Sequence, residues 1–267
     1  MRWTIRPVCV GIFKGQEKSN LTYGQGHGIK LRTPSVIWVV SNQRRTVLVD
    51  TGISDPEWAA KYHSPIERRQ EHEPLTALQR MGIEPAEIEL VVLSHLHWDH
   101  SFNNGLFPNA RFLVQRRELQ YAIAPLPSHA IHYEAPSIGM RPPWLDTVHR
   151  FELLDGDQPL DDGLRVVFLP GHTPGLHGLL VTTETGRMMI ASDCISRFES
   201  WQGRPRHQWI PSGIFVDLET YYRSLYRVEE LADYVLPSHD MAVFEREIYP
   251  SAEPLPTGPI VAGPSDG

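Results

Sequence analysis

The sequence contains few cysteines and no long hydrophobic run. Cys9 and Cys194 are the only two cysteines in 267 residues, too few for a disulfide framework or for a zinc site built from thiolates. No apolar stretch approaches the roughly 18 to 20 residues that span a bilayer. The N-terminus lacks a signal-peptide pattern, because Pro7 and Gly11 interrupt its apolar stretch. These absences predict a soluble, cytoplasmic protein without a membrane partner, in which any metal site uses nitrogen and oxygen ligands.

Positive charge is also scarce. The formal net charge is -7, which argues against a surface that follows a phosphate backbone. We therefore expect a small-molecule substrate and no nucleic-acid partner. We find no internal repeat at a fixed period, and the chain is long enough to bury a core of its own. The oligomeric state is left open.

Short runs of β-branched residues alternate with helical patterns, which predicts an α/β protein. Seven runs are expected to be strands: 35–40, 45–50, 88–94, 110–115, 164–170, 187–192 and 233–238. Segments 73–82 and 217–232 have the spacing of amphipathic helices, and Asp217 can cap the second one.

Proline marks two irregular parts of the chain. Segment 116–150 contains five prolines after residue 124 and is expected to form a long loop or a lid. The tail from about residue 254 is rich in proline and glycine, so we expect it to lie on the surface or to fray.

Three histidines and an aspartate lie close together in the stretch "VVLSHLHWDH" at 91–100. In an extended segment His95, His97 and Asp99 would point to one side, and a turn at Asp99 would bring His100 round to join them. Imidazole and carboxylate suit zinc, and also manganese, iron or cobalt. The cluster therefore predicts the beginning of two neighbouring sites for divalent metals.

Further ligand types follow other predicted strands. His172 lies in "LPGHTPG", Asp193 in "IASDC" and His239 in "LPSHD". A carboxylate has two oxygens, so Asp193 could bridge two metals, while Asp240 competes less well with His239 as a ligand. Their shared placement just after apolar runs indicates that they complete the sites begun at His95.

The motifs "SHLHWDH", "GHTPG", "SDC" and "SHD", with "VDTG" at 49–52, resemble the five ordered motifs of the metallo-β-lactamase superfamily. The resemblance implies an αββα sandwich, in which two mixed β-sheets pack face to face with helices outside. Since the motifs span 50–239, it also implies one domain over 1–267. The stretches "FNNGLFPNARFLVQRRELQYA" and "HTPGLHGLLV" are similar to the N-acyl homoserine lactonase group.

The resemblance also assigns roles to residues. It places one metal ion on His95, His97 and His172, a second on Asp99, His100 and His239, and Asp193 between them. Asp50 matches an aspartate that orients a ligand histidine.

The chemistry implied is hydrolysis of a lactone with two divalent ions per chain. Zinc is the first expectation, with iron, manganese or cobalt as alternatives. Two such ions can hold a hydroxide at neutral pH, because coordination lowers the pKa of water to about 7. Asp99 is the expected proton carrier, so Asp99 and Asp193 are the candidate catalytic residues. An N-acyl homoserine lactone is the first substrate expected.

Two other functions stay open. A thioester hydrolase of the glyoxalase II kind shares the ligands, and a non-catalytic metal-binding protein would need no more than they provide. One departure from the lactonases concerns the substrate: they commonly carry a tyrosine where this chain has Ser196. The eight other histidines carry no motif and are assigned to solvent or packing. Six aromatic side chains could rim the pocket but are more simply explained as packing: Trp98, His129, His132, Tyr133, Trp201 and Trp209.

Overall fold

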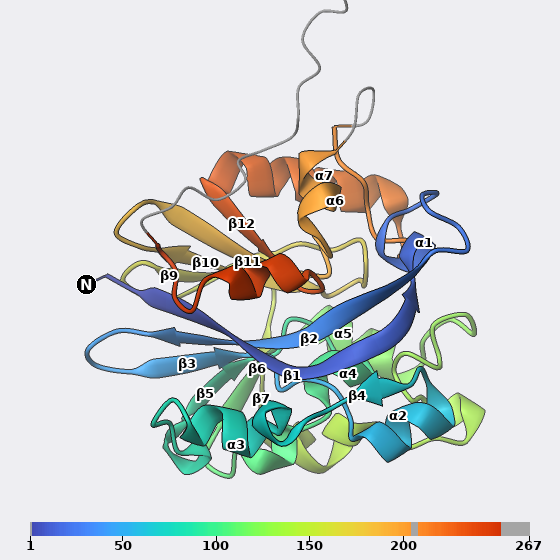
Figure 1. The fold of residues 1–267 in the computed structure, drawn as a ribbon, viewed down its shortest axis with the longest axis horizontal. Helices are drawn as coiled ribbons and strands as arrows, with labels where there is room; N and C mark the ends of the chain where they lie inside the picture. The colour runs from blue at the N-terminus through green and yellow to red at the C-terminus, as the bar shows by residue number, and fades with distance from the viewer. Residues whose placement is uncertain (1, 204–207, 252–267) are drawn as a thin grey trace, which may run out of the picture.

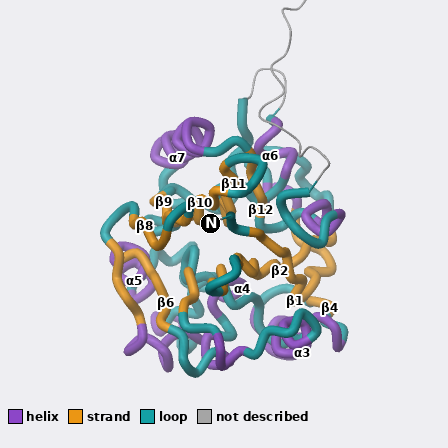
Figure 2. Tube along the Cα trace, turned by 90° about the vertical axis from the view of Figure 1, so that its left-hand side faces the viewer, coloured by secondary structure: helices purple, strands orange, loops and turns teal. Residues whose placement is uncertain are grey.

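The computed structural model describes residues 2–203 and 208–251. Two mixed β-sheets pack face to face, and helices cover both outer faces (Figures 1 and 2). One sheet has seven strands in the order β4-β1-β2-β3-β5-β6-β7, and the other has five in the order β12-β11-β10-β9-β8. The αββα sandwich expected from the motifs is confirmed. None of the helices in the described ranges is long and apolar enough to cross a membrane.

The seven-stranded sheet consists of β1 (Thr4–Glu17), β2 (Lys30–Ser41), β3 (Thr46–Val49), β4 (Ile66–Glu67), β5 (Leu90–Val92), β6 (Arg111–Gln115) and β7 (Phe151–Leu154). The five-stranded sheet consists of β8 (Gln158–Asp161), β9 (Leu164–Phe168), β10 (His177–Thr182), β11 (Arg187–Ser192) and β12 (Tyr234–Pro237). Strands β3, β5, β6 and β7 run parallel to one another, as do β11 and β12. Parallel neighbours end at the same edge of a sheet, so the loops after these strands can meet.

The α-helices are α1 (Lys18–Leu21), α2 (Pro56–Tyr62), α3 (Pro74–Gln79), α4 (Trp98–Ser101), α5 (Arg116–Ile123), α6 (Phe198–Gln202) and α7 (Leu218–Leu231). Six 3₁₀ segments complete the described helical structure: η1 (Gln70–His72), η2 (Pro85–Glu87), η3 (Asn104–Leu106), η4 (Pro136–Ile138), η5 (Pro143–Arg150) and η6 (Met241–Glu245).

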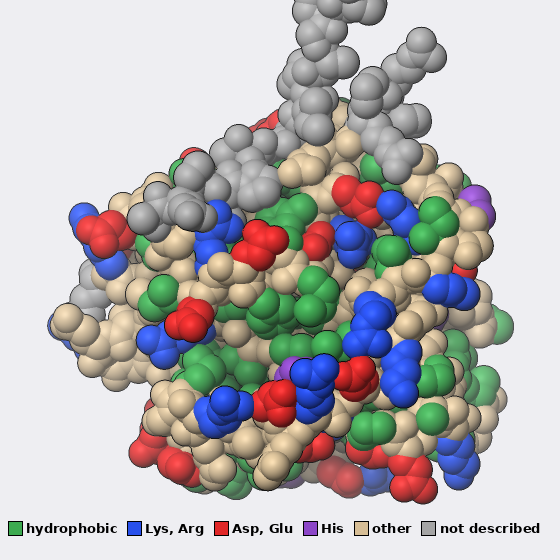
Figure 3. Space-filling view, in the orientation of Figure 1, with side chains coloured by type: hydrophobic (Ala, Val, Ile, Leu, Met, Phe, Trp, Pro, Cys, Tyr) green, Lys and Arg blue, Asp and Glu red, His purple; other side chains and the backbone are tan. Residues whose placement is uncertain are grey.

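Three hydrophobic clusters correspond to the three interfaces between the layers. The central cluster joins the inner faces of the two sheets, with Trp38 and Val92 from one and Leu179 and Ile190 from the other. A second cluster covers the outer face of the seven-stranded sheet beneath α3 and α5. The third packs α7 on the outer face of the five-stranded sheet. The outer surface in Figure 3 shows acidic and basic side chains interspersed around a group of hydrophobic ones.

All seven predicted strands are present, and the predicted helices correspond to α3 and α7. The side chain of Asp217 caps α7 by accepting a hydrogen bond from the Thr220 amide at 3.0 Å. Five strands were not predicted: β1, β4, β7, β8 and β10. Bulges interrupt the alternation of β1, and glycine interrupts the short run of β10. The expectation of irregular structure over 116–150 is wrong for the first part of this segment, where α5 forms. The tail from residue 254 lies outside the described residues.

Candidate metal centre

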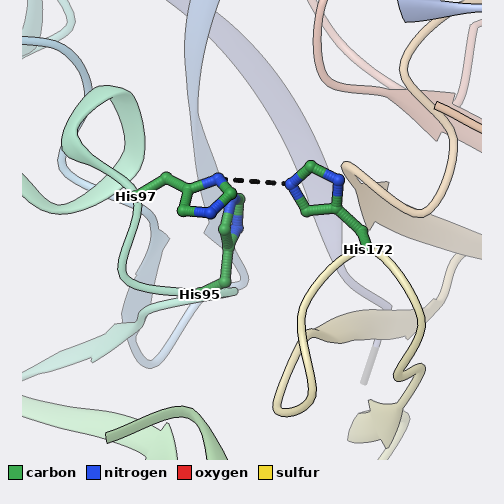
Figure 4. A group of neighbouring side chains, drawn as sticks. All are labelled: His95, His97 and His172. Atoms are coloured by element: carbon green, nitrogen blue, oxygen red, sulfur yellow. Dashed lines mark hydrogen bonds between the residues drawn. The ribbon is translucent and has the colours of Figure 1, made fainter. Parts of the chain in front are cut away.

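The seven candidate ligands converge at the edge where strands of both sheets end. His95 and His97 lie in the loop after β5, Asp99 and His100 in α4, His172 between β9 and β10, Asp193 after β11, and His239 after β12. Their ligand atoms form three overlapping groups, and the atoms of each lie within 4.8 Å of one another: His95–His97–His172, His95–His100–Asp193 and Asp99–His100–His239. Figure 4 shows the first group, with His172 facing the other two from the opposite loop.

The extended conformation expected from His95 to Asp99 is wrong. Strand β5 ends at Val92, and helix α4 begins at Trp98. Asp99 therefore reaches the centre from a helical turn, and its Oδ2 lies 3.7 Å from His100 Nε2. The four side chains still converge, because a turn of helix brings successive residues to the same end of the strand.

Asp193 lies between the two groups of histidines. Its Oδ1 is 3.3 Å from His100 Nε2 and 3.1 Å from His239 Nε2. Its Oδ2 is 3.4 Å from His172 Nε2, which in turn lies 3.2 Å from His97 Nδ1. Each carboxylate oxygen thus faces a different group, which is the arrangement that a bridging carboxylate requires.

Hydrogen bonds at the outer nitrogens fix three of the imidazole rings. His100 Nδ1 lies 2.7 Å from Asp50 Oδ2, His172 Nδ1 lies 2.7 Å from the Ile214 carbonyl, and His239 Nδ1 lies 2.9 Å from the Pro34 carbonyl. A carbonyl can only accept, so Nδ1 of His172 and of His239 carries the proton and Nε2 presents a lone pair. The contact of Asp50 with His100 is the one implied by the motif resemblance.

A nitrogen without a partner tests whether these residues suit a cation. The buried Nε2 atom of His95 has no hydrogen-bond partner among the described residues. A buried polar atom without a partner costs about 1–3 kcal/mol, whereas a divalent cation would use its lone pair. The nitrogen and oxygen donors suit zinc, iron, manganese and cobalt. The residues therefore fit a pair of divalent ions.

The pKa values of the histidines differ between the two sides of the centre. Burial lowers the pKa values of His95 and His97 well below the ordinary value. Burial also acts to lower the pKa of His100 and His239, but nearby carboxylates, first that of Asp193, outweigh it and raise both. Burial would raise the pKa of Asp193, but His239 and His100 hold it well below its usual range. Cations at this centre would displace the protons held there.

Glu118 is a supporting residue that the sequence analysis missed. Its carboxylate is fully buried on α5 and accepts four hydrogen bonds. On Oε1 they come from the Leu96 amide at 3.0 Å and the Tyr133 hydroxyl at 2.8 Å. On Oε2 they come from the Thr173 hydroxyl at 2.7 Å and the Gly175 amide at 3.1 Å. Glu118 thus ties the loop of His95 and His97 to that of His172.

The approach of the His172 loop to helix α5 depends on a glycine. A Cβ on Gly175 would lie 2.3 Å from the backbone nitrogen of Glu118, which no side chain could tolerate. Burial raises the pKa of Glu118, against the hydrogen bonds from Thr173 and Leu96. The available sequence signal was a charged residue on the buried face of a helix, four positions before the buried Ala122.

A cavity of about 350 Å³ opens onto the candidate ligands. This volume suits a small-molecule ligand. Aromatic and aliphatic side chains form part of its wall, with polar side chains from β1, α1 and β2: Phe13, Gln16, Glu17, Asn20, Leu21, Lys30, Tyr62, His63, Trp98, Ile131, His132 and Ile214. Burial lowers the pKa of His132 to about 4, so its ring is neutral at ordinary pH.

Three side chains close to the candidate ligands in the sequence, those of Cys194, Asp240 and Ser196, do not join the centre. Cys194 belongs to the hydrophobic cluster under α7 and faces away from the centre, and burial raises its pKa. Asp240 caps η6 through a bond from the Ala242 amide. The Ser196 hydroxyl is buried without a hydrogen-bond partner among the described residues, and Ser196 does not line the cavity.

Of the six aromatic side chains weighed for the pocket, Trp98 and His132 line the cavity. Packing alone therefore does not describe these two side chains, because both border the cavity beside the candidate ligands. His129, Tyr133, Trp201 and Trp209 are buried and do not line it.

Residues 31–239 match the family described as the metallo-beta-lactamase superfamily. The chain is 29% identical over 242 residues to N-acyl homoserine lactonase AttM of Azorhizobium caulinodans, covering 83% of this chain and 87% of that protein. It is 28% identical over 225 residues to an N-acyl homoserine lactonase of a Bacillus species, covering 80% of each.

Solved structures share the fold. One is an N-acyl homoserine lactone hydrolase with the product N-hexanoyl-L-homoserine at its catalytic metal centre. It has a TM-score of 0.73 at 20% identity and covers 92% of this chain and 96% of its own. Another is AidC, a dizinc quorum-quenching lactonase, with a TM-score of 0.66 at 20% identity over 90% of this chain and 88% of its own. At this identity the likeness concerns the fold alone.

Proposed function

Because the chain belongs to the metallo-β-lactamase superfamily, we propose that it is a metal-dependent hydrolase that opens a lactone ring, with an N-acyl homoserine lactone as the first substrate to test. The curated relatives described above are lactonases of this kind. Consumption of such a lactone would make the protein a quorum-quenching enzyme. We also propose that it works as a single domain, because the centre needs both sheets.

One observation carries the proposal: seven ligand-type side chains converge at a cavity of about 350 Å³. We assign one ion to His95, His97 and His172, and the other to Asp99, His100 and His239. Asp193, whose two oxygens face different groups, would bridge them. Zinc is the metal proposed, since imidazole and carboxylate are among its usual ligands.

When bound, two divalent ions lower the pKa of water to about 7 and polarise an ester carbonyl. The residues of the chain position the reaction. Asp50 and the Ile214 and Pro34 carbonyls fix the rings of three histidines, so their lone pairs are directed before substrate arrives. Ser238 donates a hydrogen bond to Asp193 Oδ1 at 2.6 Å and holds that carboxylate in place.

Asp99 is the residue proposed to move a proton. Its carboxylate lines the cavity and is 12% exposed, so a substrate can reach it. In hydrolysis the water oxygen bonds to the carbonyl carbon, and the ring C–O bond breaks. Asp99 takes the proton that the water loses and delivers it to the leaving alkoxide oxygen, which yields a hydroxy acid.

Acid release at constant pH tests the proposal. We expect the zinc-loaded protein to hydrolyse members of a panel of γ- and δ-lactones that includes N-hexanoyl-homoserine lactone. S-Lactoylglutathione and a β-lactam serve as comparison substrates. Turnover of the thioester with no turnover of any lactone would refute the proposal and favour a thioester hydrolase.

A further inference from the structure

His132 has the only cavity-lining imidazole that is neither a candidate metal ligand nor hydrogen-bonded through its ring, within the described residues. His63 also lines the cavity and is not a candidate ligand, but its Nε2 lies 2.7 Å from Glu134 Oε1. The His132 ring lines the cavity beside His97, with ring centroids 5.2 Å apart. The nitrogens of the His132 ring are therefore available to a molecule bound in the cavity.

The backbone that carries His132 is held on both sides. Its own carbonyl accepts a hydrogen bond from the Trp98 amide at 2.9 Å, at the start of the helix that bears Asp99. The preceding turn is closed by a bond from the His132 amide to the His129 carbonyl at 3.0 Å.

The two following side chains anchor the segment further. The Tyr133 hydroxyl donates to Glu118. Glu134 accepts a bond from Trp58 Nε1 at 2.6 Å and contacts His63. The backbone that carries the His132 ring is therefore held in place, while no hydrogen bond within the described residues occupies the ring nitrogens. Such preorganisation is what a substrate-positioning group requires.

Ser196 cannot perform this task in the observed fold. Its hydroxyl is buried and does not border the cavity, so it cannot contact a bound molecule there. An imidazole can donate one hydrogen bond to a carbonyl oxygen, as a hydroxyl can.

We propose that His132 binds the substrate by donating a hydrogen bond to the carbonyl oxygen that lies beside the metal centre. This inference rests on the proposed lactone hydrolysis. A donor aimed at an oxygen that gains negative charge during reaction favours the transition state over the ground state, so the effect belongs mainly to kcat.

The test compares His132→Phe and His132→Gln with the unmodified protein. Phenylalanine replaces the imidazole with an aromatic ring that has no nitrogen, whereas the glutamine amide can still donate. His129→Phe is the matched control, because His129 lies in the same segment but bonds to Tyr121 outside the cavity. The metal content by elemental analysis, and kcat and KM for N-hexanoyl-homoserine lactone, are measured for each protein.

We expect His132→Phe to retain the metal content of the unmodified protein and to lose about 100-fold or more in kcat, as when one oxyanion donor is removed. His132→Gln should keep more activity than the phenylalanine variant, and His129→Phe should match the unmodified protein. Unchanged kcat and KM in His132→Phe, equal losses in both His132 variants, or loss of metal from His132→Phe would each overturn the inference. Absence of lactone turnover by the unmodified protein would instead refute the proposed function, and this inference with it.

Discussion

Replacing Glu118 with glutamine should loosen one half of the metal centre. A glutamine has one acceptor oxygen and one NH₂ group, so only one of the two donor pairs at Glu118 keeps its acceptor. Each pair consists of a hydroxyl and a backbone amide: Thr173 with Gly175, and Tyr133 with Leu96. At the pair that faces the NH₂ group, the hydroxyl can rotate and accept a hydrogen bond from it. The backbone amide can only donate, so it loses its partner.

The expected cost follows from that count. One stranded buried N–H lowers the free energy of unfolding by about 1–3 kcal/mol. Alanine would strand both amides, about 2–6 kcal/mol, a large share of the roughly 5–15 kcal/mol that stabilises a typical domain. Glutamine is therefore the informative variant, because it should still fold.

The loss should also reach the metal, since Glu118 joins the loop of His95 and His97 to that of His172. We expect affinity for the ion assigned to these histidines to fall about 10- to 100-fold, as when a group that orients ligands is removed. Denaturant unfolding of the chelator-treated protein gives the stability, and calorimetric titration with zinc gives the affinity. Glu134→Gln is the control, because Glu134 is equally buried but bonds to Trp58 and His63 instead.

Glu118→Gln should lose stability and zinc affinity at one of its two sites, whereas Glu134→Gln should keep both zinc affinities, because its one acceptor oxygen can still face Trp58 and His63. Two zinc affinities equal to those of the unmodified protein would refute the idea that this carboxylate sets the spacing of the two loops. Equal weakening in Glu134→Gln would show that general destabilisation, rather than loop spacing, controls metal binding.

Three further predictions concern separate parts of the molecule. Asp193→Ala should abolish activity and release metal, because both sites lose a shared ligand; two ions per chain by elemental analysis would contradict the bridging assignment. Burial would raise the pKa of Glu199, but Lys18 and a neighbouring arginine lower it, so its stabilising effect is present above pH 4.5 and is lost as the pH falls through its folded-state pKa. Glu199→Gln should therefore flatten the acid side of a stability-against-pH curve near that range, and an unchanged curve would count against it. Gly171→Ala should unfold the protein at lower denaturant or abolish expression, because φ is +142° and a Cβ would lie 2.3 Å from Tyr221 Cα; a variant as stable as the parent in denaturant would show that the turn can shift.

The sequence was informative where the pattern is local. Buried strands such as β5 and β11 are short apolar runs, and the candidate ligands stand out because several residues of ligand type follow such runs in the same way. Order along the chain and the fold of the superfamily then supply the long-range pairing. This explains why the seven candidate ligands and the two-sheet sandwich could be predicted together.

Features that depend on tertiary contacts could not be predicted in the same way. Glu118 looks like an ordinary helical glutamate until the turn at Gly175 is packed against it. The helix over Trp98–Ser101 replaces the extended chain that alternation predicts, because His97 is its N-cap and the Trp98 amide pairs with His132. Likewise the sequence offered His129 and His132 equally as residues that could rim the pocket, and only the folded cavity shows that His132 borders it.

The distribution of the ligands along the chain has a consequence for protein synthesis. His239 follows β12, the last strand of the five-stranded sheet, and its ring is held by the Pro34 carbonyl in β2. A nascent chain that has not yet released residue 239 from the ribosome therefore lacks one of the three ligands proposed for the second ion. If the two ions bind as proposed, the complete centre can form only after the whole 34–239 span has emerged.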